Sequence, residues 1–307
     1  MVYIKLEEDM DKFFIKNFSG IFKKILFVFY KKIGKIKVQK INNIEYILLP
    51  ECNDKVLKKL NKISKVKCWT NLCVSNNLME NERFKSFVAK NNFNLMDGKW
   101  LFKNIVSQII EYIVNLKNEK IEVQEISILC NKLDETIVEQ IKEISQKVKL
   151  FNILTDNIKK FQKIEEQIQE KNGIIINVSN NYKKVLNKSN IIINYDFDES
   201  QINKCFFSKN GYFINLAENI NIENKEFHGR NIVSYDVYMP LKYIEYQKKM
   251  DGFDNNILYE SFIYKRTSYH NIRKILQKDN LKIFYLKDSN QKIIKIISPK
   301  TLDKIAN

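Results

Sequence analysis

Residues 126–154, ISILCNKLDETIVEQIKEISQKVKLFNIL, decide the fold class of this chain. The stretch begins with the short apolar run 126–130 and ends with a second one, 150–154. Between the two runs, Asp134 is a good helix N-cap residue, and the isoleucines that follow it recur every three or four positions. The pattern predicts a strand, a helix and a strand, the unit from which parallel sheets are built.

The same alternation continues to about residue 236. Further expected elements are helices at 157–171 and 181–188 and strands at 174–178, 191–193, 212–216 and 232–234. Apolar strands joined by helices predict a doubly wound, mainly parallel sheet with the strand order 3-2-1-4-5-6. Ligands of such sheets bind beyond the carboxyl ends of the strands at the switch point, here the turn after Cys130 and the strand end at Asn194.

The segments on either side have a different character. Residues 1–120 indicate strands at 22–30, 41–49 and 66–74, helices at 54–64 and 81–91, and a long helix that begins at Lys99. Residues 241–307 indicate helices at 243–249 and 255–277, then a β-hairpin around 288–290. The chain is therefore predicted to be α/β in three parts: a mixed α/β domain (1–120), the doubly wound sheet (121–240), and a helical segment with a terminal hairpin (241–307).

Composition excludes several classes of protein. The chain has 307 residues, of which 44% are hydrophobic, so it can bury a sizeable core. No apolar run approaches the roughly 20 residues that span a bilayer, and the N-terminus lacks signal-peptide order, so we expect a cytoplasmic protein without a membrane partner. Five unpaired-looking cysteines and two histidines argue against a disulfide framework, a metal site and a Ser-His-Asp hydrolase.

The charge is strongly basic and unevenly spread. The formal net charge is +16, yet only four of the 52 basic residues are arginine. Abundant Lys, Ile and Asn indicate an AT-rich genome such as that of a Firmicute, so part of the lysine excess reflects coding bias. Residues 1–120 carry +11, residues 121–240 carry −2 and residues 241–307 carry +7. The basic flanks therefore suggest nucleic acid as one partner.

Two motifs in residues 121–240 carry a resemblance to a known family. The second expected strand ends in Leu154-Thr155-Asp156, and residues 188–194 read KSNIIIN. Together with the strand and helix order, they resemble the NAD(P)-binding Rossmann domains of shikimate dehydrogenase and glutamyl-tRNA reductase. The resemblance implies a dinucleotide site at Cys130, Asn131, Asp156 and Asn194, with Asp156 on the ribose hydroxyls, and hydride transfer as the chemistry of an active enzyme.

The sequence departs from that family where the phosphates should bind. Residues 130–136 read CNKLDET, without the glycines that let the backbone approach a pyrophosphate. Asp134 and Glu135 would repel an anion at the helix N-terminus, and the bulky, acidic residues 195–197 follow the strand end. We therefore expect no or weak NAD(P) binding. The prediction is a Rossmann-like protein with a degenerate cofactor site and a ligand-binding or regulatory role, with a small nucleotide-like molecule as one candidate partner.

A second candidate site lies near the C-terminus. Arg266, His270 and Arg273 are spaced so that they share one helical face. In a chain that otherwise uses lysine, two arginines indicate a planar donor to phosphate or carboxylate, so an anion site is predicted; the alternative is a solvated basic face. The alternative function is a basic nucleic-acid- or ribosome-associated protein that uses the charged flanks. The sequence leaves substrate, remaining catalytic activity and oligomeric state open.

Overall fold

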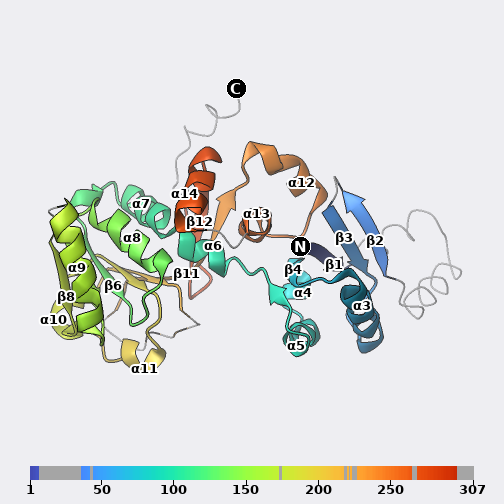
Figure 1. Cartoon of the computed structure of the whole chain (residues 1–307), viewed down its shortest axis with the longest axis horizontal. Helices are drawn as coiled ribbons and strands as arrows, with labels where there is room; N and C mark the ends of the chain where they lie inside the picture. The colour runs from blue at the N-terminus through green and yellow to red at the C-terminus, as the bar shows by residue number, and fades with distance from the viewer. Residues whose placement is uncertain are drawn as a thin grey trace, which may run out of the picture. The chain divides into compact units, whose positions relative to one another are not determined.

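The computed structural model describes residues 1–6, 36–41, 44–172, 175–217, 220, 222, 227–264 and 268–295 (Figure 1). The chain forms two compact units, Met1–Trp100 with Leu241–Tyr264, and Leu101–Pro240 with Lys265–Asn307. These units group the segments differently from the predicted division at residues 120 and 240. The reason is that the helix before residue 116 and the C-terminal hairpin both pack with the doubly wound sheet. The strand expected at 22–30 lies outside the described residues.

The second unit contains an eight-stranded sheet in the order β13-β12-β11-β10-β9-β6-β7-β8. Its strands are β6 (Glu125–Leu129), β7 (Leu150–Leu154), β8 (Ile176–Ser179), β9 (Ile191–Asn194), β10 (Tyr212–Asn215), β11 (Arg230–Tyr238), β12 (Lys282–Asp288) and β13 (Ile293–Ile294). Strands β6 to β11 pair in parallel. Counted along the chain from β6, their order is 3-2-1-4-5-6, so the predicted doubly wound α/β sheet is confirmed.

Helices connect these strands as the hydrophobic periodicity predicted. The unit contains α7 (Val106–Leu116), the 3-10 helix η1 (Ile121–Val123), α8 (Glu135–Ser145), α9 (Ile158–Asn172), α10 (Tyr182–Leu186), α11 (Glu199–Ile202) and α14 (Tyr269–Lys278). Helix α8 begins after Asp134, whose side chain accepts the Ile137 N–H at 2.8 Å. Beside α10 and α11, Leu129, Leu154 and Ile192 build one apolar core with Leu186 and Ile202. The sheet is thus held by packing that the strand pattern had indicated.

Three expected elements differ from the structure. The single helix expected from Lys99 is two helices, α6 (Lys99–Asn104) and α7, because Ile105 leaves the helical backbone region at φ −111° and ψ 19°. The helix expected at 255–277 is likewise two, α13 (Asn255–Ile263) and α14. The predicted C-terminal hairpin is present as β12 and β13, but β12 also pairs antiparallel with β11 and so extends the main sheet.

The first unit has a five-stranded sheet in the order β2-β3-β1-β4-β5. Its strands are β1 (Val2–Leu6), β2 (Lys37–Ile41), β3 (Ile44–Leu49), β4 (Asn71–Val74) and β5 (Asn94–Leu95). Its helices are α3 (Asp54–Lys67), α4 (Asn76–Met79), α5 (Glu82–Lys90), η2 (Leu241–Tyr243), α12 (Ile244–Lys249) and α13, with α6 at the boundary between the units. The strand expected at 66–74 is shorter, because α3 continues to Lys67 and ends at Cys68 in the left-handed region (φ 53°).

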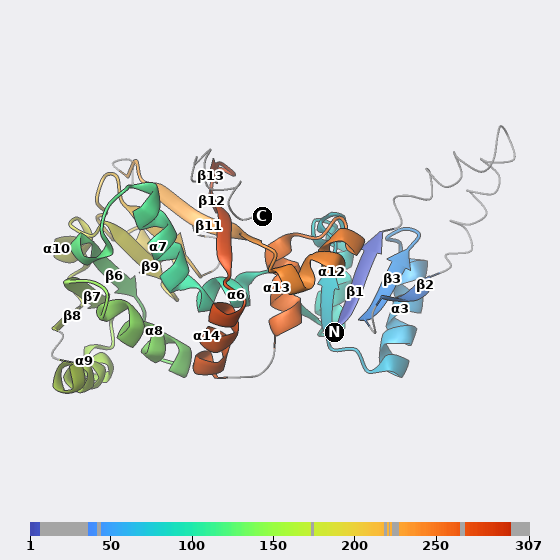
Figure 2. The ribbon, with the colours of Figure 1, turned by 90° about the horizontal axis from the view of Figure 1, so that it is seen from above.

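Each face of this first sheet is covered by helices. On one face, Val2, Ile4 and Ile47 pack with Leu57 of α3 and Phe87 of α5. On the other face, the Tyr3 ring lies near Phe253 and Phe262, and its hydroxyl is 2.9 Å from the Ser261 hydroxyl. Figure 2 shows β1 and β3 between α3 on one side and α12 with α13 on the other. Among the described residues, no helix has both the length and the apolar character that a bilayer crossing requires.

Candidate functional site

The predicted site residues meet at the carboxyl edge of the doubly wound sheet. Cys130 and Asn131 follow β6, Asp156 follows β7 and Asn194 ends β9, and these three strands are neighbours. The structure therefore brings the four residues to the edge at which a doubly wound sheet binds its ligand. What the side chains do there depends on their hydrogen bonds.

Asp196 holds the turn that follows β6. Its two carboxylate oxygens accept the backbone N–H groups of Asn131 at 2.7 Å and Lys132 at 2.5 Å. Backbone N–H groups of this turn are the donors that a Rossmann domain offers to a pyrophosphate. In this chain, a carboxylate from the end of β9 occupies two of them.

Asp156 is bound from several sides. It accepts hydrogen bonds from the Asn131 amide at 3.3 Å, from the Gln201 amide at 2.9 Å and from the Tyr182 hydroxyl. Its own N–H donates to Asn131 Oδ1 at 2.8 Å. Burial, followed by the hydrogen bond and the charge of Asp156, raises the pKa of Tyr182 well above the usual value, so this phenol remains protonated as a donor. The carboxylate expected to bind ribose hydroxyls is thus engaged within the chain.

Asn194 and Cys130 have structural surroundings. The Asn194 amide donates to the Phe197 carbonyl at 3.0 Å and to Asn215 Oδ1 at 3.1 Å, and its oxygen accepts the Phe197 N–H at 2.9 Å. Cys130 is fully buried, and burial, with the nearby Asp196 and Asp134 charges, raises the pKa of its thiol far above the usual value. A thiol held in the protonated form is a poor nucleophile and a poor metal ligand. The described residues contain no cluster of three potential metal ligands.

The N-terminus of α8 is acidic. Asp134 caps the helix and Glu135 occupies its first turn. Carboxylates at this end stabilise a helix through its dipole, but they oppose an incoming phosphate. The phosphate position therefore faces three carboxylates from this chain, those of Asp134, Glu135 and Asp196.

The second predicted site is only partly within the described residues. Arg266 lies outside them, His270 is exposed on α14, and Arg273 pairs with Glu143 of α8 at 2.6 Å. Tyr269 also donates to Glu143, at 2.9 Å, and Lys147 contacts the same carboxylate at 3.0 Å. The planar donor of Arg273 therefore meets a carboxylate of its own unit. An anion site of Arg266, His270 and Arg273 remains a prediction.

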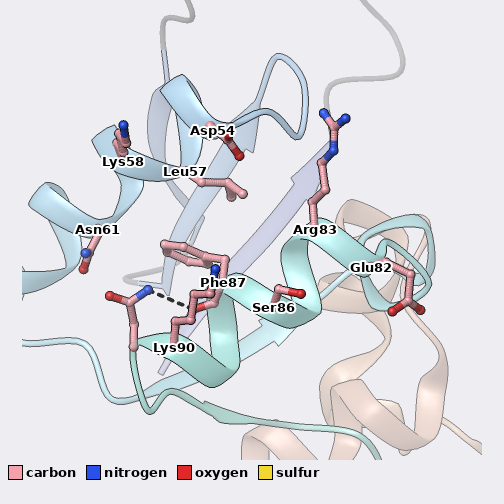
Figure 3. A pocket seen from close by; sticks show the side chains of 10 residues that line it. Asp54, Leu57, Lys58, Asn61, Glu82, Arg83, Ser86, Phe87 and Lys90 are labelled. Atoms are coloured by element: carbon pink, nitrogen blue, oxygen red, sulfur yellow. Dashed lines mark hydrogen bonds between the residues drawn. The ribbon is translucent and has the colours of Figure 1, made fainter.

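A cavity of about 530 Å³ in the first unit escaped the sequence reading (Figure 3). It lies between α3 and α5, and its lining includes Leu57, Phe87 and three basic side chains. The only sequence signal was the density of lysine in helix 54–67, which reads as ordinary surface charge until the second helix is placed beside it. Tyr182 and Gln201 were missed for a similar reason, because they reach Asp156 from separate helices.

No family model matches the chain, and no curated protein matches it. Similar solved structures include L-tryptophan dehydrogenase from Nostoc punctiforme, at 9% identity and TM-score 0.31, covering 74% of this chain and 65% of that one. One of the subunits of dipicolinate synthase from Bacillus halodurans gives 10%, 0.32, 51% and 54% for the same quantities. A shikimate dehydrogenase in complex with NADP+ gives 10%, 0.27, 71% and 76%.

The chain thus spans less than two thirds of the length of the first two of these proteins. All three TM-scores lie below 0.5, so the fold class rests on the strand order and pairing described above. At this level of identity, the comparisons support no particular source organism for the chain.

Proposed function

We propose that this protein is a Rossmann-like binding or regulatory protein, related to NAD(P)-dependent dehydrogenases, whose dinucleotide site is degenerate. One observation carries the proposal: the Asp196 carboxylate accepts the Asn131 and Lys132 N–H groups. A pyrophosphate would have to displace this carboxylate and then lie beside it, at a cost in Coulomb repulsion. Hydride transfer would therefore lack a bound cofactor.

The ribose position supports the same conclusion. Asp156 could accept ribose hydroxyls only by giving up donors from Asn131, Tyr182 and Gln201. Each broken bond leaves a donor that must find a new partner, so binding at this position would be weakened further. The predicted preference is no binding or weak binding of NAD(P).

Calorimetry with NAD and NADP tests the proposal. The wild type should show no binding tighter than about 1 mM, a free energy of only about −4 kcal/mol. Asp196→Ala should gain measurable affinity, because it frees two N–H donors and removes one negative charge. Glu199→Ala is the matched control, since Glu199 is exposed and caps no part of the turn after β6. Micromolar affinity in the wild type would overturn the proposal.

A second candidate function, nucleic-acid binding through the basic flanks, is favoured by one observation. Helix α3 carries six lysines and one aspartate, and five of those lysines are exposed. Phosphate contacts make affinity fall steeply with salt. Binding of a single-stranded oligonucleotide at 50 mM and at 200 mM salt therefore separates this candidate from a small-molecule function.

A further inference from the structure

The cavity between α3 and α5 has the size and lining of a ligand site. Its volume of about 530 Å³ lies within the range that small-molecule pockets occupy. Leu57 and Phe87 supply an apolar floor, and both belong to the core of the first unit. Figure 3 shows the Phe87 ring facing Leu57 between the two helices, with Asn61 towards one end and Arg83 towards the other. The floor is rigid because it continues the core beneath it.

The rim of the cavity carries positive charge that no carboxylate neutralises by contact. Lys58, Arg83 and Lys90 line the cavity, all three are exposed, and none has a hydrogen bond or ion pair within the part of the chain that the structure describes. Glu82 also lines it, but its carboxylate pairs with Lys85 at 2.6 Å. The remaining acidic residue is Asp54, in the first turn of α3. Three free cations around one opening favour an anionic ligand.

Neutral polar groups extend the chemistry of the lining. Asn61, Ser86 and Asn91 combine donors and acceptors with the apolar floor. Asn91 uses its amide N–H to bind the Phe87 carbonyl at 2.8 Å, which orients its oxygen as the acceptor that remains. Arg83, one of four arginines in the chain, provides the planar donor that suits a phosphate. Apolar surface, amide groups and cations together match a nucleotide: a ring system, polar ring edges and a phosphate.

We propose that the α3–α5 cavity binds a nucleotide, with its phosphate on Lys58, Arg83 and Lys90 and its ring over Leu57 and Phe87. The nucleotide is either free or one unit of a single-stranded RNA, since both present the same chemistry to the cavity. The inference does not depend on the dinucleotide site, because every residue it uses belongs to the first unit.

The test uses the full chain and two triple variants of equal charge. The cavity variant carries Lys58→Ala, Arg83→Ala and Lys90→Ala. The control carries Lys62→Ala, Lys65→Ala and Lys248→Ala, three exposed lysines of the same unit that do not line the cavity. Binding of AMP and ATP is measured by calorimetry, and binding of a labelled ten-nucleotide single-stranded RNA by fluorescence anisotropy at 50 mM and 200 mM salt. Thermal melts verify that both variants fold.

The expected result is binding that the cavity variant weakens at least tenfold and the control less than threefold. Binding of AMP or ATP with little salt dependence identifies a free nucleotide as the ligand. Binding of RNA alone, with a steep salt dependence, identifies single-stranded nucleic acid. Equal losses in the two variants, or no binding of any of the three probes at millimolar concentration, overturn the inference. The Asp196→Ala variant leaves this cavity intact, so failure here and failure of the proposed function are distinguishable.

Discussion

Asp196 and Asp156 reach the turn after β6 from the ends of two different strands. Asp196 accepts two backbone N–H groups of the turn, and Asp156 is joined to the same turn through Asn131. The first carboxylate thus stabilises the loop conformation while it removes the donors that a pyrophosphate needs. Stability and the loss of the cofactor position have one physical cause at this residue.

Removal of the Asp196 carboxylate should therefore destabilise the second unit. Hydrogen bonds to a charged group contribute about 1.5–3 kcal/mol, and solvent can reach part of this half-buried turn, so we expect Asp196→Ala to lower the free energy of unfolding by about 2 kcal/mol. Asp196→Asn keeps one acceptor and should lose about half as much. Urea denaturation measures both changes. Wild-type stability in Asp196→Ala would contradict the assigned hydrogen bonds.

The sequence could identify Asp196 as unusual but could not show its role. A bulky, acidic run after Asn194 stood out against the resemblance, and so did the missing glycines. That the carboxylate turns back onto residues 131 and 132 depends on β9 lying beside β6, a pairing between residues more than 60 positions apart. Periodicity predicts elements, but it does not specify which side chain meets which backbone group.

At the scale of elements, α14 is attached to α8 through a single carboxylate. Glu143 of α8 receives Arg273 at 2.6 Å and the Tyr269 hydroxyl at 2.9 Å, both from α14. Lys147, which contacts Glu143 at 3.0 Å, also binds the Ser107 hydroxyl of α7 at 2.6 Å. The cluster therefore links three helices that are far apart in the sequence.

Arg273→Lys tests whether this link needs a guanidinium. Lysine keeps the charge but loses the planar arrangement of donors, so we expect a loss of about 1 kcal/mol in the free energy of unfolding. His270→Ala, an exposed change on the same helix, should stay within about 0.5 kcal/mol of the wild type. Chemical denaturation compares the three proteins. An equal effect of the two substitutions would show that the ion pair contributes nothing specific.

The same carboxylate should make stability depend on pH. Burial raises the pKa of Glu143, but hydrogen bonds from Ser107 and Lys147 and the charges of Arg273 and Lys147 outweigh it, so the pKa lies below the ordinary 4.5. A carboxyl group with a lower pKa in the folded state stabilises fully above its unfolded pKa and loses this contribution as pH falls through the folded pKa. The stability difference between wild type and Glu143→Gln should therefore be constant at neutral pH and shrink below pH 4.5.

Glu139→Gln is the matched control for this pH series. Glu139 lies on the same helix, and its side chain pairs with Lys142 while 40% exposed. An exposed pair of this kind contributes little, so the control should show a smaller difference at every pH. A difference between wild type and Glu143→Gln that does not change between pH 7 and pH 3 would contradict the lowered pKa.

Elements with strong periodicity were predictable, whereas those defined by pairing were not. The crossover helices α8 and α9 follow the expected ranges within two residues, because an apolar stripe and a good N-cap specify them locally. Strand β1 was missed, although it lies in the middle of its sheet. Its five residues acquire strand character only through Tyr46–Leu49 on one side and Leu72–Val74 on the other, which lie far along the chain.

At the scale of the whole molecule, both units are discontinuous in sequence. The first contains Met1–Trp100 and Leu241–Tyr264, and the second contains Leu101–Pro240 and Lys265–Asn307. Composition and charge change near residues 120 and 240, but contacts follow the sheets, so a division read from composition groups α7 and the hairpin with the wrong neighbours by contact. Only the placement of β12 beside β11 reveals that the end of the chain completes the second unit.

This arrangement gives opposite expectations for two shortened chains. Residues 121–240 alone lose α7 and α14 from beside α8, and β12 from beside β11. Exposed apolar surface and an open sheet edge should then leave this piece aggregated or without cooperative unfolding. Residues 101–240 joined to 265–307 through a flexible Gly/Ser linker keep all of these contacts and should unfold in one cooperative transition. Differential scanning calorimetry and near-UV circular dichroism of both pieces decide the matter. A cooperative melt of 121–240 alone would favour the three-part division, because it would show that the doubly wound sheet needs neither its preceding helix nor its C-terminal strand.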